Sequence, residues 1–157
     1  MKEPGRAASR RARIVVLRKS RRWRASPRPL VQFAARIAAD LRLSGEITIV
    51  LGTDAQIRAL NRRFRGLDYA TDVLSFPAAG GGERGGDIVI SMRAAADQAS
   101  ELGHPLATEL RILVLHGLLH LAGYDHETDR GRMRRREEQL RRRGRLPSGL
   151  IQRARGA

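Results

Sequence analysis

The amino-acid sequence predicts an α+β fold, in which a small mixed β-sheet of about four strands is covered by about five helices within one domain. Three observations lead to this prediction. Short runs rich in β-branched residues are separated by longer segments whose apolar residues recur at helical spacing. From residue 92 onward the expected elements are all helices, whereas the expected strands all lie before that residue. The segment from Leu110 to Ala122 is apolar on nearly every side, so we expect it to form a buried central helix.

The individual elements are justified by their own patterns. Residues 46–52 alternate and are β-branched, which is typical of a strand, and residues 30–41 carry the apolar stripe of an amphipathic helix. Asp54 and Thr128 are candidate N-caps, Pro105 fits the start of the central helix, and the glycine-rich segment 78–86 is expected to be a loop. The expected strands cover residues 14–17, 46–52, 71–76 and 86–91, and the expected helices cover 30–41, 55–65, 92–102, 105–121 and 128–143.

The charge of the chain is strongly positive. Its formal net charge is +15, from 31 Lys and Arg against 16 Asp and Glu. Such an excess attracts polyanions, of which nucleic acid is the usual one. Nearly all the basic residues are Arg, with lysine only at Lys2 and Lys19, and Arg binds phosphate in a bidentate manner. Alternatively, the Arg richness follows genomic base composition and forms a solvated face, but that does not account for the net excess.

The domain organisation is expected to be simple. A chain of 157 residues has the size of one domain. We expect a disordered basic N-terminus over residues 1–11, one folded domain over 12–146 and a flexible tail over 147–157. The chain has no Cys and no apolar stretch suited to span a bilayer, so we expect no membrane partner. Residues 1–28 have the composition of a transit peptide, but 12–17 look like a strand of the fold, which favours a cytoplasmic protein.

Three histidines are the candidate metal ligands. In HGLLHLAGYDH at 116–126, His116 and His120 are four residues apart, so their rings project from one face of the predicted central helix. Gly123 permits a positive backbone torsion that can end the helix and return His126 to the same place. Three imidazoles favour one zinc ion, although other divalent transition metals would also bind, and three protein ligands leave a fourth position open.

The same spacing, H-x3-H-x2-G-x2-H, is used by the metzincin proteases. Those enzymes place a Glu directly after the first His as general base, whereas this sequence has Gly117. Peptide hydrolysis therefore lacks its base, while a metal could still lower the pKa of a bound water and polarise a phosphoryl oxygen. A metalloprotease-like hydrolase and histidines that merely hydrogen-bond within the core remain the alternatives. His104 lies outside the pattern, and we expect it in a loop or at the surface.

The chain resembles the YbeY family of bacterial rRNA maturation factors, which are metal-dependent endoribonucleases. The resemblance rests on three blocks in the family's order, and it extends from about Ile14 to the last helix. The blocks are NRRFRGLDYATDVLSFP at 61–77, GDIVIS at 86–91 and HGLLHLAGYDHE at 116–127. Two features depart from the family pattern: the loop after Pro77 is short and glycine-rich, and both termini are unusually rich in Arg.

The resemblance implies roles for particular residues. His116, His120 and His126 would be the zinc ligands, and Arg65 would be the cleft arginine that holds the scissile phosphate and stabilises charge in the transition state. The alternative for Arg65 is a helix-end ion pair with Asp68. Further candidates have an equally plain structural interpretation, either hydrogen bonding to the backbone or facing solvent; they are Thr71, Asp72, Ser75, Asp125 and Glu127.

The resemblance also implies a cellular function. It predicts an endonuclease, specific for single strands, that matures the 3′ end of small-subunit rRNA and supports ribosome quality control. Its partners would be single-stranded RNA, the small ribosomal subunit and a ribosome-assembly GTPase. Whether the nucleophile is water or the 2′-hydroxyl stays open. A different class of function, a non-catalytic ribosome-assembly factor with a structural zinc, is the remaining alternative.

Overall fold

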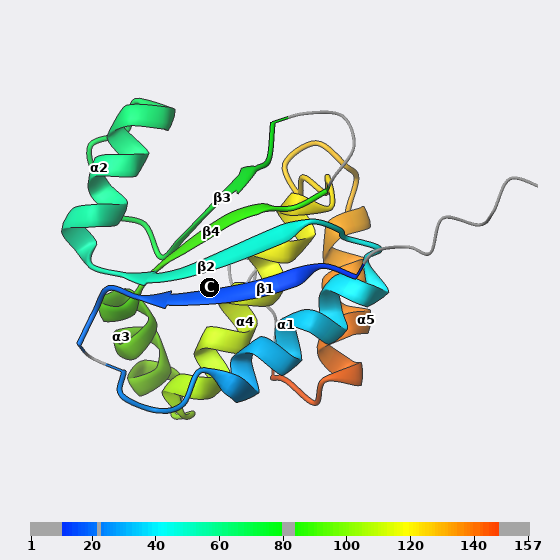
Figure 1. Ribbon diagram of the computed structural model, residues 1–157, viewed down its shortest axis with the longest axis horizontal. Coiled ribbons are helices and arrows are strands. Elements are labelled where there is room, and N and C mark those ends of the chain that lie inside the picture. Colours follow the sequence, from blue (N-terminus) through cyan, green and yellow to red (C-terminus); the bar gives the residue numbers. More distant parts are fainter. Residues whose placement is uncertain (1–10, 22, 80–83, 148–157) are drawn as a thin grey trace, which may run out of the picture.

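The computed structural model describes residues 11–21, 23–79 and 84–147, and the described part of the chain has the predicted α+β architecture (Figure 1). The disorder expected for residues 1–11 and the flexible tail expected for 147–157 fall almost entirely outside the described residues. None of the helices in these ranges combines the length and the apolar character that crossing a bilayer requires.

The sheet is mixed and has four strands, as the sequence predicts. The strands are β1 (Arg13–Arg18), β2 (Glu46–Gly52), β3 (Val73–Pro77) and β4 (Gly86–Ser91), in the spatial order β1-β2-β4-β3. β1, β2 and β4 are parallel, whereas β3 runs antiparallel to β4 with Val73 opposite Ile90 and Ser75 opposite Ile88. β3 therefore forms one edge of the sheet.

The helices lie on both faces of the sheet, but unequally. They are α1 (Arg28–Asp40), α2 (Asp54–Arg65), α3 (Met92–Leu102), α4 (Leu106–Leu121) and α5 (Arg132–Arg143). Among the described residues, α2 alone covers one face, while α1, α3 and α5 pack around α4 on the opposite face (Figure 1). The two-residue period of the strands divides their side chains accordingly: Ile49 and Ile88 join the large core with α4, and Val89 joins a small cluster with Ile57 of α2.

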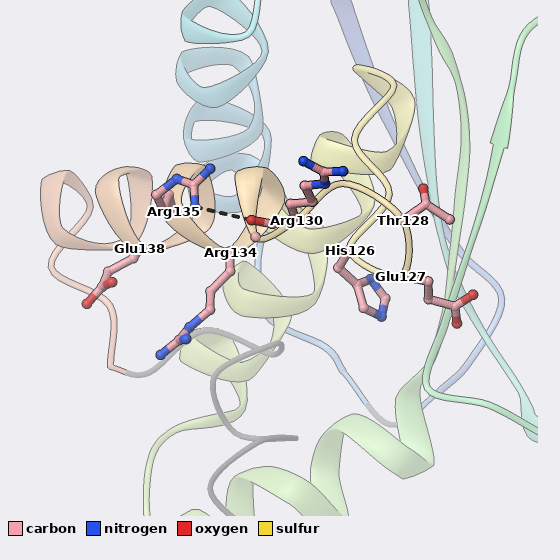
Figure 2. Close-up of a pocket in the computed structure, with 8 residues that line it drawn as sticks. His126, Glu127, Thr128, Arg130, Arg134, Arg135 and Glu138 are labelled. Atoms are coloured by element: carbon pink, nitrogen blue, oxygen red, sulfur yellow. Dashed lines mark hydrogen bonds between the residues drawn. The ribbon is translucent and has the colours of Figure 1, made fainter.

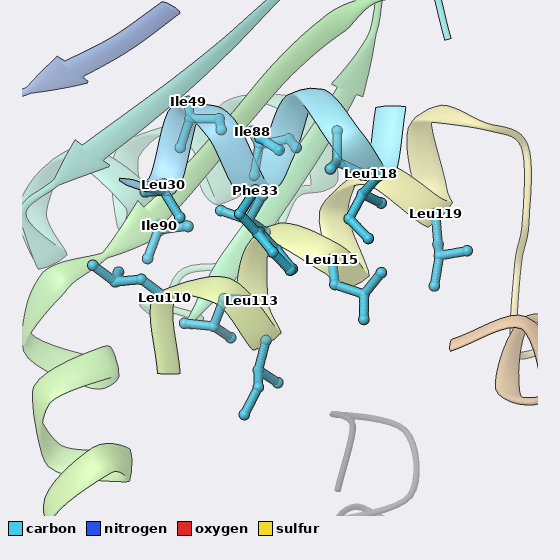
Figure 3. Packing of buried hydrophobic residues seen from close by; sticks show 14 of the residues in the cluster. Leu30, Phe33, Ile49, Ile88, Ile90, Leu110, Leu113, Leu115, Leu118 and Leu119 are labelled. Carbon is cyan, nitrogen blue, oxygen red and sulfur yellow. The ribbon is translucent and has the colours of Figure 1, made fainter. Parts of the chain in front are cut away.

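The prediction of a buried central helix is confirmed. Eleven residues of α4 are buried, and its leucines meet Phe33 of α1 and isoleucines of the sheet (Figure 3). Two expected caps are wrong in detail. α2 begins at Asp54 with Thr53 as its N-cap, because Thr53 and Gln56 form a reciprocal capping box. α5 begins only at Arg132, since the Asp129 side chain accepts the backbone N–H groups of Gly131 and Met133.

Candidate metal centre and cleft

The end of α4 brings the three histidines together. His116 and His120 lie one turn apart on α4, which ends at Leu121. Gly123 follows with φ of 92°, a conformation that glycine adopts without strain and that turns the chain away from the helix axis. His126 lies in the loop before α5, as Figure 2 shows. The structure thus places all three predicted ligands in one cluster, by the turn that the sequence suggested.

The geometry of the three rings suits a shared ion. Nε2 of His116 and Nε2 of His120 are 3.2 Å apart, and one ligand nitrogen from each of the three histidines falls within 4.8 Å of the others. Two nitrogens bound at about 2.0–2.1 Å to one tetrahedral zinc ion are separated by about 3.3 Å. The pair on α4 therefore already has the separation that a common ion requires.

The chemical state of the rings also fits a metal. Burial, followed by the neighbouring His116 and His126, lowers the pKa of His120 from its ordinary 6.5 to about 4. The ring is thus neutral at neutral pH and offers a lone pair, which is the form that binds metals. In addition, Nδ1 of His126 is buried without a hydrogen-bond partner in the described part of the chain. Buried polar atoms normally have a partner, and a metal ion bound in the cluster is one that this nitrogen could have.

A fourth residue, Glu137, supports the cluster and was missed in the sequence. Its carboxylate accepts a hydrogen bond from Nδ1 of His116 at 3.1 Å, and the Glu137 residue is only 2% exposed. This bond fixes the tautomer of His116 in which Nε2 is unprotonated and faces His120. A signal existed: Glu137 shares an i, i+4 and i, i+3 stripe with Met133 and Leu140, the other two buried residues of α5.

The histidine cluster opens into a cleft of about 710 Å³. Its remaining walls come from the end of α2, the segment 71–77 that includes β3, and the loop at 125–127. Arg65 lines this cleft, as predicted, from the last residue of α2. The alternative pairing of Arg65 with Asp68 is not seen, because the carboxylate of Asp68 accepts from Nε of Arg58 at 2.9 Å. That interaction lowers the pKa of Asp68 and raises that of Arg58.

The other polar candidates of segment 71–77 line the cleft but are tied to the fold. Asp72 accepts hydrogen bonds from the backbone N–H of Val73 and from the side chain of Gln98, and its neighbour Thr71 donates to it. The hydroxyl of Ser75 donates to the carbonyl of Gly117 at 3.2 Å. Their plain interpretation as hydrogen-bonding residues at a strand is therefore the one that the contacts support.

The loop residues beside His126 differ in role. Asp125 organises the turn, since its side chain accepts the backbone N–H of Glu127 and its carbonyl accepts from Thr128 and Asp129. Glu127 is exposed and lines the cleft. His104 lies in the loop before α4, as expected, but its side chain is only 15% exposed.

Gly117 has a packing reason for being a glycine. A Cβ atom at this position would lie 2.8 Å from the side chain of Ile88, a contact that real Cβ atoms essentially never make. Position 117 therefore faces β4 and not the cleft. The protease glutamate that the sequence lacks has no space at this position.

An arginine-lined pocket continues from the cleft on the other side of His126. It has a volume of about 610 Å³ and shares His126 and Glu127 with the cleft. Arg130, Arg134 and Arg135 line it, and Figure 2 shows them around the start of α5. The one other acid of the lining, Glu138, is held by Arg141 and Arg142.

Fold and site together define an α+β protein in which a three-histidine group and an arginine share one cleft. The family model described as endoribonuclease YbeY matches residues 15–144. The chain belongs to the YbeY family of endoribonucleases. The resemblance inferred from the three sequence blocks is thus confirmed.

Individual relatives agree with this assignment. The chain is 55% identical over 119 residues to the endoribonuclease YbeY of Koribacter versatilis, covering 76% of each chain. It is 48% identical over 127 residues to that of Solibacter usitatus, covering 80% of this chain and 85% of the relative. Among solved structures, the solution structure of TM1509 from Thermotoga maritima matches with a TM-score of 0.58 and 27% identity, over 82% of this chain and 86% of that one.

Proposed function

We propose that this protein is a zinc-dependent endoribonuclease that cleaves single-stranded RNA in the cleft of Arg65, with His116, His120 and His126 holding one zinc ion. The single observation that carries the proposal is the approach of the three ring nitrogens to within 4.8 Å of one another in that cleft. The three-imidazole set favours zinc, although other divalent transition metals suit it as well.

The residues of the cleft divide the work between them. Arg65 would bind the scissile phosphate and stabilise the negative charge that develops on it, since a guanidinium keeps its charge at every working pH. Glu137 would hold His116 in the required tautomer. The metal, when bound, would supply Lewis-acid polarisation of the phosphoryl oxygen and a water of lowered pKa.

The choice of RNA as substrate rests on charge as well as on the family. A net charge of +15 attracts polyanions, and the pocket of Arg130, Arg134 and Arg135 places part of that charge directly beside His126. We further propose maturation of the 3′ end of small-subunit rRNA as the biological role. The small ribosomal subunit and a ribosome-assembly GTPase would be partners, and the cytoplasm the site of action.

The test is cleavage of a defined single-stranded RNA by the metal-loaded wild type, Arg65→Ala and His120→Ala. We expect Arg65→Ala to retain the metal and to cleave RNA about 100-fold more slowly, or slower still. Removing one hydrogen-bond donor that stabilises a transition state has an effect of this size in other enzymes. His120→Ala should lose both the metal and the activity. Unchanged cleavage by His120→Ala, or by wild type in chelator, contradicts the proposed metal dependence.

The same assays separate the two other functions that the histidine spacing allows. A metalloprotease would degrade an unfolded protein and leave the RNA intact. We do not expect this outcome, because position 117 is a glycine with no space for the glutamate that such proteases use as general base. A structural zinc would lower the thermal stability sharply when removed, whereas we expect the chelated protein to keep its fold, because the core around α4 is apolar and independent of the rings.

A further inference from the structure

Aromatic side chains are scarce in this protein, and their placement is uneven. The chain has three Phe, two Tyr and one Trp. Phe33 is buried in the main core, as a phenylalanine normally is. The other two phenylalanines, Phe64 and Phe76, both line the cleft that contains the three histidines. Two of only three phenylalanines thus lie at the candidate active site.

Phe64 is unusually open for its residue type. It is 58% exposed, although phenylalanine is among the residue types most often buried in a fold. The helix that carries it has a buried face, formed by Ile57 and Asn61, and Phe64 follows on the same side in the last turn of α2, where this face is no longer buried. The fold therefore leaves the ring accessible to the cleft instead of using it for the core.

The ring is nevertheless held in place. Its centroid lies 5.2 Å from that of Phe76 at an interplanar angle of 59°, and Phe76 in turn packs against the small cluster beneath α2. The guanidinium of Arg63 lies 5.0 Å from the Phe64 centroid, and Arg65 follows directly in the chain. An exposed aromatic ring that is supported by a second ring, with one guanidinium group beside it and Arg65 lining the same cleft, is suited to hold a base and a neighbouring phosphate, as in single-strand-binding proteins.

We propose that Phe64, supported by Phe76, is a base-stacking subsite that holds one unpaired RNA base next to the phosphate bound by Arg65. The inference rests on the proposed function and adds a reason for the single-strand preference. A base in a duplex is already stacked on its neighbours, whereas an unpaired base can be turned onto the ring. Stacking is tolerant of sequence, so the subsite would select strandedness more than base identity.

The test is a cycle between protein and RNA changes, measured as kcat/KM for an RNA with a single cleavage site. Wild type and Phe64→Ala are compared on the intact RNA and on a series in which one nucleotide at a time is abasic. We expect Phe64→Ala to lower kcat/KM by about 5-fold to 100-fold on intact RNA, the range that corresponds to loss of one stacked base. At one position near the scissile bond, the abasic RNA should lower the wild-type value by a similar factor and leave Phe64→Ala unaffected.

Two control variants sharpen the result. Phe64→Trp should restore stacking, whereas Phe64→Leu should behave like Phe64→Ala because it keeps apolar surface without a π face. Tyr69→Ala removes another exposed aromatic residue, 54% exposed, that does not line the cleft, and it should show no coupling to any abasic position. Thermal unfolding should differ little among the variants, since Phe64 is outside the core.

The failures can be told apart. Equal effects of Phe64→Ala on intact and on every abasic RNA overturn the stacking subsite while leaving the nuclease intact. A defect that appears only when a protein partner is present would assign Phe64 to protein docking and also overturn it. Absence of chelator-sensitive RNA cleavage by wild type is a failure of the proposed function itself.

Discussion

The two ends of α4 carry the same chemical pair in two different settings. At the start of the helix, buried Glu109 lies 2.6 Å from Nε2 of His104, and near its end, buried Glu137 lies 3.1 Å from Nδ1 of His116. Both pairs join a histidine to a carboxylate that is almost fully buried. Only the second pair has further imidazoles beside it, because His120 and His126 lie with ring centroids 4.8 and 5.7 Å from His116.

This difference shows that a buried histidine–glutamate contact does not by itself indicate a metal centre. At His104 the contact satisfies two polar groups where the α3–α4 loop meets the helix. At His116 the same contact leaves Nε2 of the ring directed at His120. The Glu137 carboxylate therefore orients the nitrogen that would bind a metal ion. Matched substitutions at the two ends of α4 can separate these two roles.

The largest difference is expected for the histidines themselves. His120→Ala should reduce the zinc retained after dialysis from about one ion per chain to none, because two imidazoles and water hold the ion poorly. His104→Ala should retain the full amount. Metal analysis of the purified, dialysed proteins measures both, and equal metal contents would remove the distinction between the two ends of the helix.

A smaller effect is expected for the supporting carboxylate. Glu137→Gln should weaken metal binding by about 10–100-fold, the usual cost of losing a group that orients a ligand. Glu109→Gln is the matched control, since it changes the other buried carboxylate in the same way. Competition with a chromophoric chelator gives both affinities. Our interpretation of Glu137 requires that Glu137→Gln binds the metal more weakly than the wild type and that Glu109→Gln binds it equally well.

The third prediction concerns stability at the other end of the helix. His104→Ala removes one hydrogen-bond partner of the Glu109 carboxylate, which is fully buried in the first turn of α4. We expect the free energy of unfolding to fall by about 1–3 kcal/mol, as for other buried groups that lose a hydrogen-bond partner. Urea denaturation with and without zinc measures it, and a change in metal affinity in this variant would be the contrary result.

A fourth effect is a pH dependence of the metal-free protein. The pKa of His120 is lowered from 6.5 to about 4 in the fold, so the unfolded chain binds a proton more readily than the folded one between these values. Stability contributed by the neutral ring is therefore present above pH 6.5 and is lost as the pH falls toward 4. Thermal melts of the chelated protein should show this loss, and those of His120→Ala should show less of it.

Much of this architecture could be predicted from local sequence patterns. The β-branched alternation of EITIVLG and the all-round apolar character of 110–122 specify a strand and a buried helix, and both were confirmed. The strand order could not be predicted, because it depends on pairings between segments such as β2 and β4 that are distant in the chain. The helix caps were misassigned by a residue or a few because Thr and Asp residues lie side by side at both starts.

The site shows the same division. The three histidines were predicted because one helix and one turn, all local features, bring them together. Glu137 was not, since it lies in the highly charged RRREEQLRRR stretch, where one acid that turns inward resembles its exposed neighbours. For Asp68 the sequence suggested Arg65, a near neighbour in the chain, as the possible partner, and only the fold identifies Arg58, ten residues away.

The close contact at Gly117 also limits how this histidine motif can change in evolution. A single substitution to Glu would restore the protease signature on paper, but the new side chain would be driven into Ile88 of β4. The helix and the sheet would have to separate, or the residue at position 88 would have to shrink, before an acid could be accommodated there. A lineage that starts from this packing therefore needs at least one accompanying change in the packing before it can carry the protease glutamate, although the two motifs differ at that position by one letter.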